Sequence, residues 1–190
     1  ISERGTPLKF SALILICLIS SSVVAAPKES GWSDAWWIWD APGGKETDKA
    51  NQPRYMRVAF TLTEKAIAAH VRLTADNHYT VYINGTELGS DGNWSSIETH
   101  NLSKYLLVGK NVLAIDARNA GGVAGALARV FAKTATSAIA VGTSAKTRVS
   151  TELVDGWTTA AFDDSTWATA SVIGPSGTAP WNLSGGAAGT

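Results

Sequence analysis

The sequence predicts an all-β protein made of two packed antiparallel sheets. Between positions 36 and 181, apolar and polar residues alternate over short runs, which is the pattern of half-buried strands. Glycine, proline and asparagine separate these runs at roughly the 8–12-residue spacing typical of sandwiches and barrels. The helical candidate at residues 63–69 is too short and lacks a cap, so it does not outweigh its neighbours.

The strands expected in chain order are residues 57–63, 71–74, 79–83, 111–118 and 125–132, with one or two more in 137–151. In the run 79–83, Tyr79, Val81 and Ile83 alternate with polar or amphipathic residues. Successive side chains of a strand point to opposite faces, so the apolar set of each run faces a shared interior. The predicted fold class is therefore a two-sheet antiparallel β-sandwich.

A two-residue turn is predicted at Asn84 and Gly85, between alternating apolar positions. Asparagine followed by glycine suits a type I′ turn, because both central positions need positive φ. Turn chemistry alone explains both residues, and a ligand role for Asn84 is the alternative interpretation.

Four tryptophans gather near the start of the sandwich: Trp32, Trp36, Trp37 and Trp39. Strand alternation predicts that Trp37 and Trp39 face inward while Trp36 does not. We expect this group to serve the core or to cover a sheet; a platform on which ligands stack is the alternative.

The N-terminal 25 residues have the pattern of a secretory signal peptide. Arg4 and Lys9 precede an apolar run at 10–19, and small residues lead to a cleavage site after Ala25. The apolar run is shorter than the roughly 20 residues that a membrane span needs. We therefore expect residues 1–25 to be a signal peptide, 26–182 the sandwich, and 183–190 a flexible linker to a further domain. The expected location is secreted, periplasmic or cell-surface, with no membrane span after signal removal.

Composition excludes several classes of function for the mature chain. Cys17 is the only cysteine and lies within the signal peptide, so disulfide scaffolds, thiol catalysis and cysteine-ligated metals are excluded. The formal net charge is zero, which gives no electrostatic case for binding nucleic acid. The eight tryptophans exceed what a small core usually needs, which favours some at the surface.

Several segments together resemble a known family. They are Trp37-Ile-Trp39, Arg54-Tyr-Met-Arg57, Leu73-Thr-Ala-Asp76, Val81-Tyr-Ile-Asn-Gly85, Gly109-Lys-Asn-Val-Leu113 and the tail from Asp155-Gly-Trp157 to Pro180-Trp181. Their order is similar to the galactose-binding-like jelly-roll domains found beside the catalytic modules of bacterial α-L-rhamnosidases and family 2 glycoside hydrolases. The resemblance covers roughly residues 35–182 and implies a jelly-roll fold in a domain whose catalytic partner lies elsewhere.

No residue is predicted to be catalytic. Glycoside hydrolysis needs two carboxylates across the scissile bond, whereas the adjacent Asp163 and Asp164 fit a turn leading to a buried Trp167. The three histidines, His70, His78 and His100, lack metal-ligand spacing. No Gly-x-Ser-x-Gly elbow and no phosphate-binding glycine loop before a helix is present.

The loop from Gly89 to Ser95 is the candidate ligand site. Trp94 offers a ring on which the apolar face of a sugar can stack, and Asp91 and Asn93 offer hydrogen-bonding groups. Asp76 and Asn77, at the turn before Tyr79, are predicted to border the same end of the sandwich, although both are also good turn formers. The alternative for Trp94 is that it packs over the end of the sandwich.

No cofactor and no metal site is predicted. Asp91 and nearby carbonyls could contribute to a structural calcium site, but this fragment falls far short of a complete oxygen cage. The sequence thus predicts a non-catalytic carbohydrate-binding or accessory domain of an exported, glycoside-hydrolase-like bacterial protein, whose partner is a glycan or a neighbouring catalytic domain. The alternative is a structural or protein-interaction module of a secreted or surface protein.

Overall fold

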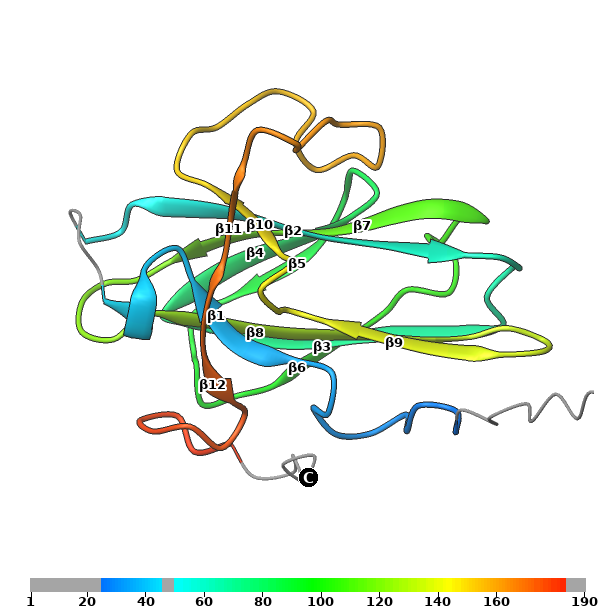
Figure 1. Ribbon diagram of the computed structural model, residues 1–190, viewed down its shortest axis with the longest axis horizontal. Coiled ribbons are helices and arrows are strands. Elements are labelled where there is room, and N and C mark those ends of the chain that lie inside the picture. Colours follow the sequence, from blue (N-terminus) through cyan, green and yellow to red (C-terminus); the bar gives the residue numbers. More distant parts are fainter. Residues whose placement is uncertain (1–24, 46–49, 184–190) are drawn as a thin grey trace, which may run out of the picture.

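The computed structural model describes residues 25–45 and 50–183 and contains two six-stranded sheets packed face to face (Figure 1). Residues 1–24 of the predicted signal peptide and 184–190 of the predicted linker lie outside the described residues. The strands are β1 (Trp36–Trp39), β2 (Pro53–Leu62), β3 (Ala68–Asp76), β4 (His78–Ile83), β5 (Thr86–Asp91), β6 (Glu98–Asn101), β7 (Gly109–Arg118), β8 (Gly125–Lys133), β9 (Ala138–Gly142), β10 (Arg148–Ser150), β11 (Ala168–Thr169) and β12 (Ser171–Pro175).

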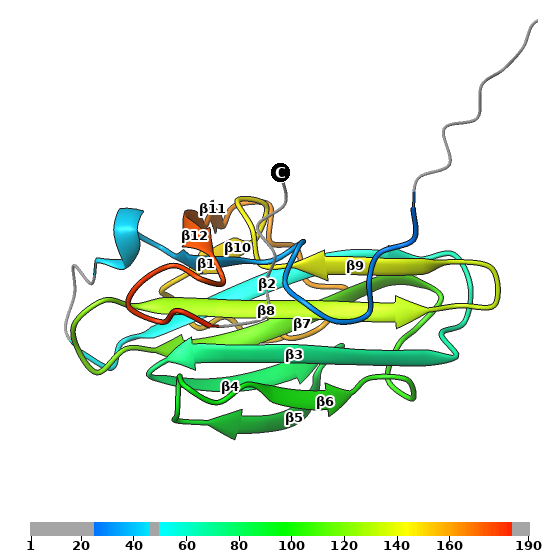
Figure 2. The same cartoon turned by 90° about the horizontal axis from the view of Figure 1, so that it is seen from below.

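The first sheet has the order β12-β1-β8-β3-β6, with β9 also paired to β8, and the second has the order β11-β10-β2-β7-β4-β5. Every pairing is antiparallel. Strands β6 and β5 form edges of the two sheets and run near each other along one side of the sandwich (Figure 2). The predicted all-β sandwich is confirmed.

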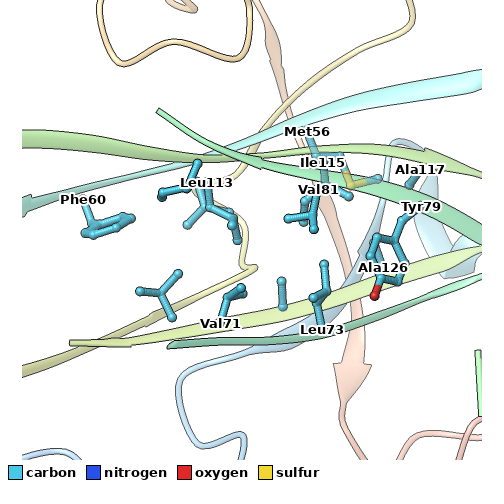
Figure 3. Packing of buried hydrophobic residues seen from close by; sticks show 14 of the residues in the cluster. Met56, Phe60, Val71, Leu73, Tyr79, Val81, Leu113, Ile115, Ala117 and Ala126 are labelled. Atoms are coloured by element: carbon cyan, nitrogen blue, oxygen red, sulfur yellow. The ribbon is translucent and has the colours of Figure 1, made fainter. Parts of the chain in front are cut away.

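The main core lies between the sheets and is built from alternate residues of the long strands (Figure 3). Strand β4 contributes Tyr79, Val81 and Ile83, and β7 contributes Leu113 and Ile115; each is at most 3% exposed. These residues are the apolar faces that the alternation predicts. Burying such side chains stabilises the fold by about 1.5–3 kcal/mol each.

The outward face of the first sheet is also covered by apolar side chains. Trp37 of β1 stacks on Trp181 with ring centroids 4.0 Å apart, and both pack with Trp32 and Leu127 in a second cluster. In this way the segments before β1 and after β12 shield one sheet from water, as Figure 1 shows below the lower layer. Arg129 fixes the N-terminal segment, because its guanidinium donates to the carbonyls of Lys28 and Glu29.

The prediction that Trp37 and Trp39 share the inter-sheet face is wrong. The register of β1 on β12 shifts between Trp37 and Ile38. The residue left unpaired by this shift is Ile173 of β12, so the alternation of β1 is not interrupted at Trp37. Ile38, opposite Ala126 of β8, takes the inter-sheet face, and Trp37 takes the opposite face in the outer cluster. Trp39 also lies in the main core, and Trp36 is 40% exposed.

The outward face of the second sheet is covered by the loop between β10 and β11. Trp157 and Trp167 of this loop pack on Tyr55 of β2 and form a third cluster. Arg57, whose side chain is fully buried, donates to Asp164 Oδ2 at 2.8 Å and to the carbonyls of Trp157 and Thr159. Arg57 thus helps to hold this loop against the sheet, together with the packing of Trp157 and Trp167.

The turn at Asn84 and Gly85 joins β4 to β5, and both residues have positive φ, 49° and 89°. The predicted turn is confirmed, and Asn84 also has a second role. Its side-chain amide donates to Asn111 Oδ1 at 2.8 Å and to the carbonyl of Tyr105, and its Oδ1 accepts from the amide of Val112. Asn84 therefore ties the hairpin to the start of β7.

Candidate functional site

The predicted ligand loop is shorter than the sequence indicates, because β5 continues to Asp91 and only residues 92–97 are loop. Asp91 Oδ2 accepts from the amide of Asn93 and from the hydroxyl of Ser96, both at 3.0 Å. Asn93 Oδ1 in turn accepts from the amide of Ser95 at 3.1 Å and from its hydroxyl at 2.7 Å. Side chain to backbone bonds of this kind fix a compact turn. The loop is thus held by its own polar groups.

Asp91 carries its charge at neutral pH. Burial is the largest single influence on the pKa of this carboxyl and raises it. Hydrogen bonds from the Asn93 amide, the Ser96 hydroxyl and the Gly92 amide lower the pKa, as does nearby His78, and together they outweigh burial. The net result is a lowered pKa. Hydrogen bonds to the ionised form have this effect.

Trp94 is half-buried against the second cluster. Its carbonyl accepts a 2.9 Å hydrogen bond from Thr74 Oγ1 of β3, which anchors the loop to the first sheet. The predicted packing of Trp94 over the sandwich is therefore part of its role. Because the residue is not fully covered, it remains partly accessible to solvent.

Asp76 and Asn77 follow each other at the end of β3 across a cis peptide bond. Asp76 is 8% exposed, and its Oδ2 accepts a 2.9 Å hydrogen bond from the indole of Trp181. Burial raises the pKa of Asp76 more than this hydrogen bond lowers it. Asn77 Oδ1 accepts from the amide of Ala120 at 2.6 Å, which holds the β7–β8 loop.

The structure brings the predicted residues to one end of the sandwich but does not gather them around one cavity. Thr74 links β3 to the loop through Trp94, and the ring of His78, next to Asn77, lies against Gly92. Trp181 is a shared neighbour, bonded to Asp76 and in the same cluster as Trp94. Asp76 and Asn77 are engaged inside the protein, whereas Trp94 and Asn93 face outward in part.

Asp91 also lines a polar groove of about 550 Å³ on the outward face of the second sheet. The groove is formed by β4, β5 and β7 and is lined by His78, Tyr79, Thr80, Ser90, Asp91, Gly92, Asp116 and Arg118. Arg118 donates to Asp116 Oδ2 at 2.9 Å, and this bond raises the pKa of the guanidinium. Sequence reasoning missed this groove, although Asp116 and Arg118 lie on the polar face of their strand.

The adjacent carboxylates Asp163 and Asp164 each have a hydrogen-bond partner in the structure. Asp163 Oδ1 accepts from the amide of Ser165 at 2.9 Å and Asp164 binds Arg57, so this pair forms a turn before the buried Trp167, as predicted. Within residues 25–45 and 50–183, no group of three or more His, Cys, Asp or Glu residues could hold a metal ion. In the same ranges no helix is long and apolar enough to cross a bilayer.

Comparison with known proteins places the chain among carbohydrate-related sandwiches. It is 30% identical over 164 residues to an α-L-rhamnosidase of Streptomyces avermitilis, and the match spans 82% of this chain but only 16% of that protein. The crystal structure of S. avermitilis α-L-rhamnosidase with L-rhamnose matches 85% of this chain and 17% of its own, with a TM-score of 0.73 and 26% identity. No protein-family model matches the chain.

A lectin has the same fold. The Pleurotus ostreatus lectin, solved with GalNAc, matches 83% of this chain and 47% of its own, with a TM-score of 0.72 and 28% identity. The α-L-rhamnosidase of Aspergillus terreus, at 19% identity and a TM-score of 0.64, supports the fold alone. The expected resemblance to a galactose-binding-like domain of rhamnosidases is confirmed.

Proposed function

We propose that this chain is a non-catalytic carbohydrate-binding domain of an exported protein and that it binds sugar at the end of the sandwich that carries Trp94. This proposal rests on the similarity to both an α-L-rhamnosidase and a lectin. The same sandwich then occurs in two different kinds of protein that were solved with a sugar bound. The chain spans about a sixth of the rhamnosidase. This is the extent expected of an accessory domain.

Trp94 is the proposed stacking surface. Sugars present apolar C–H faces to aromatic rings and hydroxyl groups to polar side chains, and sites for small ligands combine both kinds of group. Asn93 lies beside Trp94 and is exposed, and Asp91 holds the loop in place through two hydrogen bonds. We assign Asp76 and Asn77 the role of positioning this end of the sandwich, through Trp181 and the β7–β8 loop.

Export is part of the proposal and rests on the basic residues, apolar run and small residues of positions 1–25. Expression of the full chain in a bacterial host, followed by N-terminal sequencing of the exported product, tests it. A mature N-terminus at Ala26 is expected, and retention of the uncleaved chain in the cytoplasm would contradict export.

Calorimetric titration of the purified protein with L-rhamnose and with GalNAc tests binding. We expect saturable binding of at least one sugar and a loss of at least tenfold in affinity for Trp94→Ala. Trp36→Ala is the matched control, because Trp36 is 40% exposed and lies on β1 outside the proposed site. The absence of saturable binding by the folded wild-type protein would refute the proposal.

A structural module is the second candidate. The observation in its favour is that four of the five predicted ligand residues already use their side chains in hydrogen bonds within the protein: Asp76, Asn77, Asp91 and Asn93. A structural module keeps its stability and fold without any sugar affinity, so the same titration separates the two functions.

A further inference from the structure

A groove of about 580 Å³ lies on the side of the sandwich where β5 and β6, edges of the two sheets, come together (Figure 2). Its volume falls within the roughly 300–1,000 Å³ of small-molecule sites. It is lined by Leu88, Thr99, His100, Asn101, Ser103, Lys104 and Tyr105. None of the residues proposed above as the site around Trp94 takes part, so this groove is a separate place in the molecule.

The charge of this groove differs from that of two other grooves in the described residues. Lys104 lines it, whereas none of the residues lining it is acidic; Glu98, the nearest acid along β6, is not among them. The groove on β4, β5 and β7 contains two acids, Asp91 and Asp116, beside one arginine, Arg118, and a third groove, of about 490 Å³ near β10, contains Asp40 and Glu152. The groove between β5 and β6 therefore favours an anionic ligand.

Lys104 contacts an aromatic ring but forms no ion pair among the described residues. Its ammonium lies 4.8 Å from the ring centroid of Tyr105, a cation–π arrangement that limits where the charge can point. Within the part of the chain that the structure describes, Lys104 forms no ion pair with a carboxylate. A carboxylate entering the groove would thus meet an ammonium that has no competing acid.

The remaining lining residues match the rest of a sugar acid. Tyr105 and Leu88 offer apolar surface, and Thr99 and Asn101 are exposed polar side chains. The ring of His100 lies against β5, where a Cβ at Gly89 would come within 3.0 Å of its Cε1. The Nε2 of His100 is buried and has no hydrogen-bond partner among the described residues.

We infer that the groove between β5 and β6 is a second binding site, specific for a carboxylated monosaccharide. The ammonium of Lys104 would bind the carboxylate, while Thr99 and Asn101 bind ring hydroxyls and Tyr105 contacts the C–H face. This second site is distinct from the proposed sugar site at Trp94 and does not depend on it.

Titration of the purified protein with D-glucuronate and with D-glucose, followed by NMR of the His100 ring and by calorimetry at low salt, tests the inference. We expect glucuronate to bind at least tenfold more tightly than glucose and to shift the His100 resonances saturably. Lys104→Gln should remove at least tenfold of the glucuronate affinity. Lys110→Gln should retain it, because Lys110 is an exposed lysine on β7 that does not line the groove.

Two further measurements distinguish a sugar-acid site in this groove from the site around Trp94 and from a general anion site. Trp94→Ala should leave glucuronate binding unchanged, so failure of the proposed sugar site and failure of this inference are distinguishable. Equal affinity for glucuronate and glucose, or unmoved His100 resonances, would overturn the inference. Inorganic phosphate binding as tightly as glucuronate would also overturn it, because the groove would then bind anions without recognising the sugar.

Discussion

The indole N–H of Trp181 donates a 2.9 Å hydrogen bond to Asp76 Oδ2, between residues 105 positions apart in the sequence. This bond joins the end of β3 to the segment after β12, and it lies beside the stack of Trp181 on Trp37. Two consequences follow: Asp76 is held inside the protein by Trp181, and the burial of its carboxyl makes stability depend on pH.

Asp76→Asn should become more stable relative to wild type as pH rises. Burial raises the pKa of Asp76 above its usual 3.8. An acid with a raised pKa in the folded state binds more protons when folded. Its ionisation penalty is therefore absent below the unfolded pKa and grows as pH rises through the folded pKa. Urea denaturation of both proteins between about pH 3 and pH 7 measures the difference.

Asp163→Asn provides the control of opposite sign. A bond from the amide of Ser165 lowers the pKa of Asp163, so wild type should gain stability over this variant as pH rises. A stability difference between Asp76→Asn and wild type that stays flat with pH would contradict the assignment for Asp76.

Arg57→Leu should destabilise the protein by about 3–5 kcal/mol, because Asp164 and the loop carbonyls then lose the buried guanidinium that binds them. The loop between β10 and β11 should then become sensitive to limited proteolysis. Arg118→Leu is the control: the side chain of Arg118 is 47% exposed in its pair with Asp116, and exposed pairs contribute only about 0–1 kcal/mol. Equal effects of the two substitutions would show that Arg57 does not hold the loop.

Asn84→Gly tests whether Asn84 does more than turn the chain. Glycine adopts the required positive φ but cannot make the bonds to Asn111, Tyr105 and Val112, so we expect a loss of about 1–3 kcal/mol in the free energy of unfolding. Asn51→Gly, at an exposed position with φ of 66°, should change stability by no more than about 0.5 kcal/mol. If Asn84→Gly leaves the free energy of unfolding unchanged, Asn84 acts only as a turn residue.

Gly125→Ala should disturb the outer cluster of the first sheet. A Cβ at this position would come within 2.7 Å of the Trp181 ring and 2.9 Å of the Trp37 ring. Overpacking of this kind costs about 1–3 kcal/mol. Gly177→Ala, where no atom lies within 4 Å of the added Cβ, is the matched control. Thermal unfolding followed by tryptophan fluorescence measures both, and identical melting of both variants would argue against the stack.

The strand faces could be predicted because alternation is a local signal. Tyr79, Val81 and Ile83 lie in the core as their spacing indicates, and Asn84 with Gly85 turns the chain as this dipeptide favours. The inward placement of Trp37 was wrong because β1 is apolar at all four positions, so alternation does not show which residues face the core, and Ile38 takes that face. The local pattern alone therefore predicted the wrong face for Trp37.

The candidate sites were harder to predict, because they depend on residues that meet only after folding. The loop after β10 lies on the sheet through Arg57 and Asp164, which are 107 residues apart. The groove beside Lys104 arises where two strand edges from different sheets come together. The composition of the loop made Trp94 a candidate, but only the structure shows that Asp76 is engaged by Trp181.

The most direct test of the sugar site is an NMR titration of the tryptophan indole N–H resonances of the protein with L-rhamnose and GalNAc. We expect the resonance of Trp94 to shift saturably with at least one sugar, while that of Trp36 stays in place. Saturable binding that moves groups elsewhere and leaves Trp94 unchanged, or no saturable shift with either sugar, would contradict this expectation.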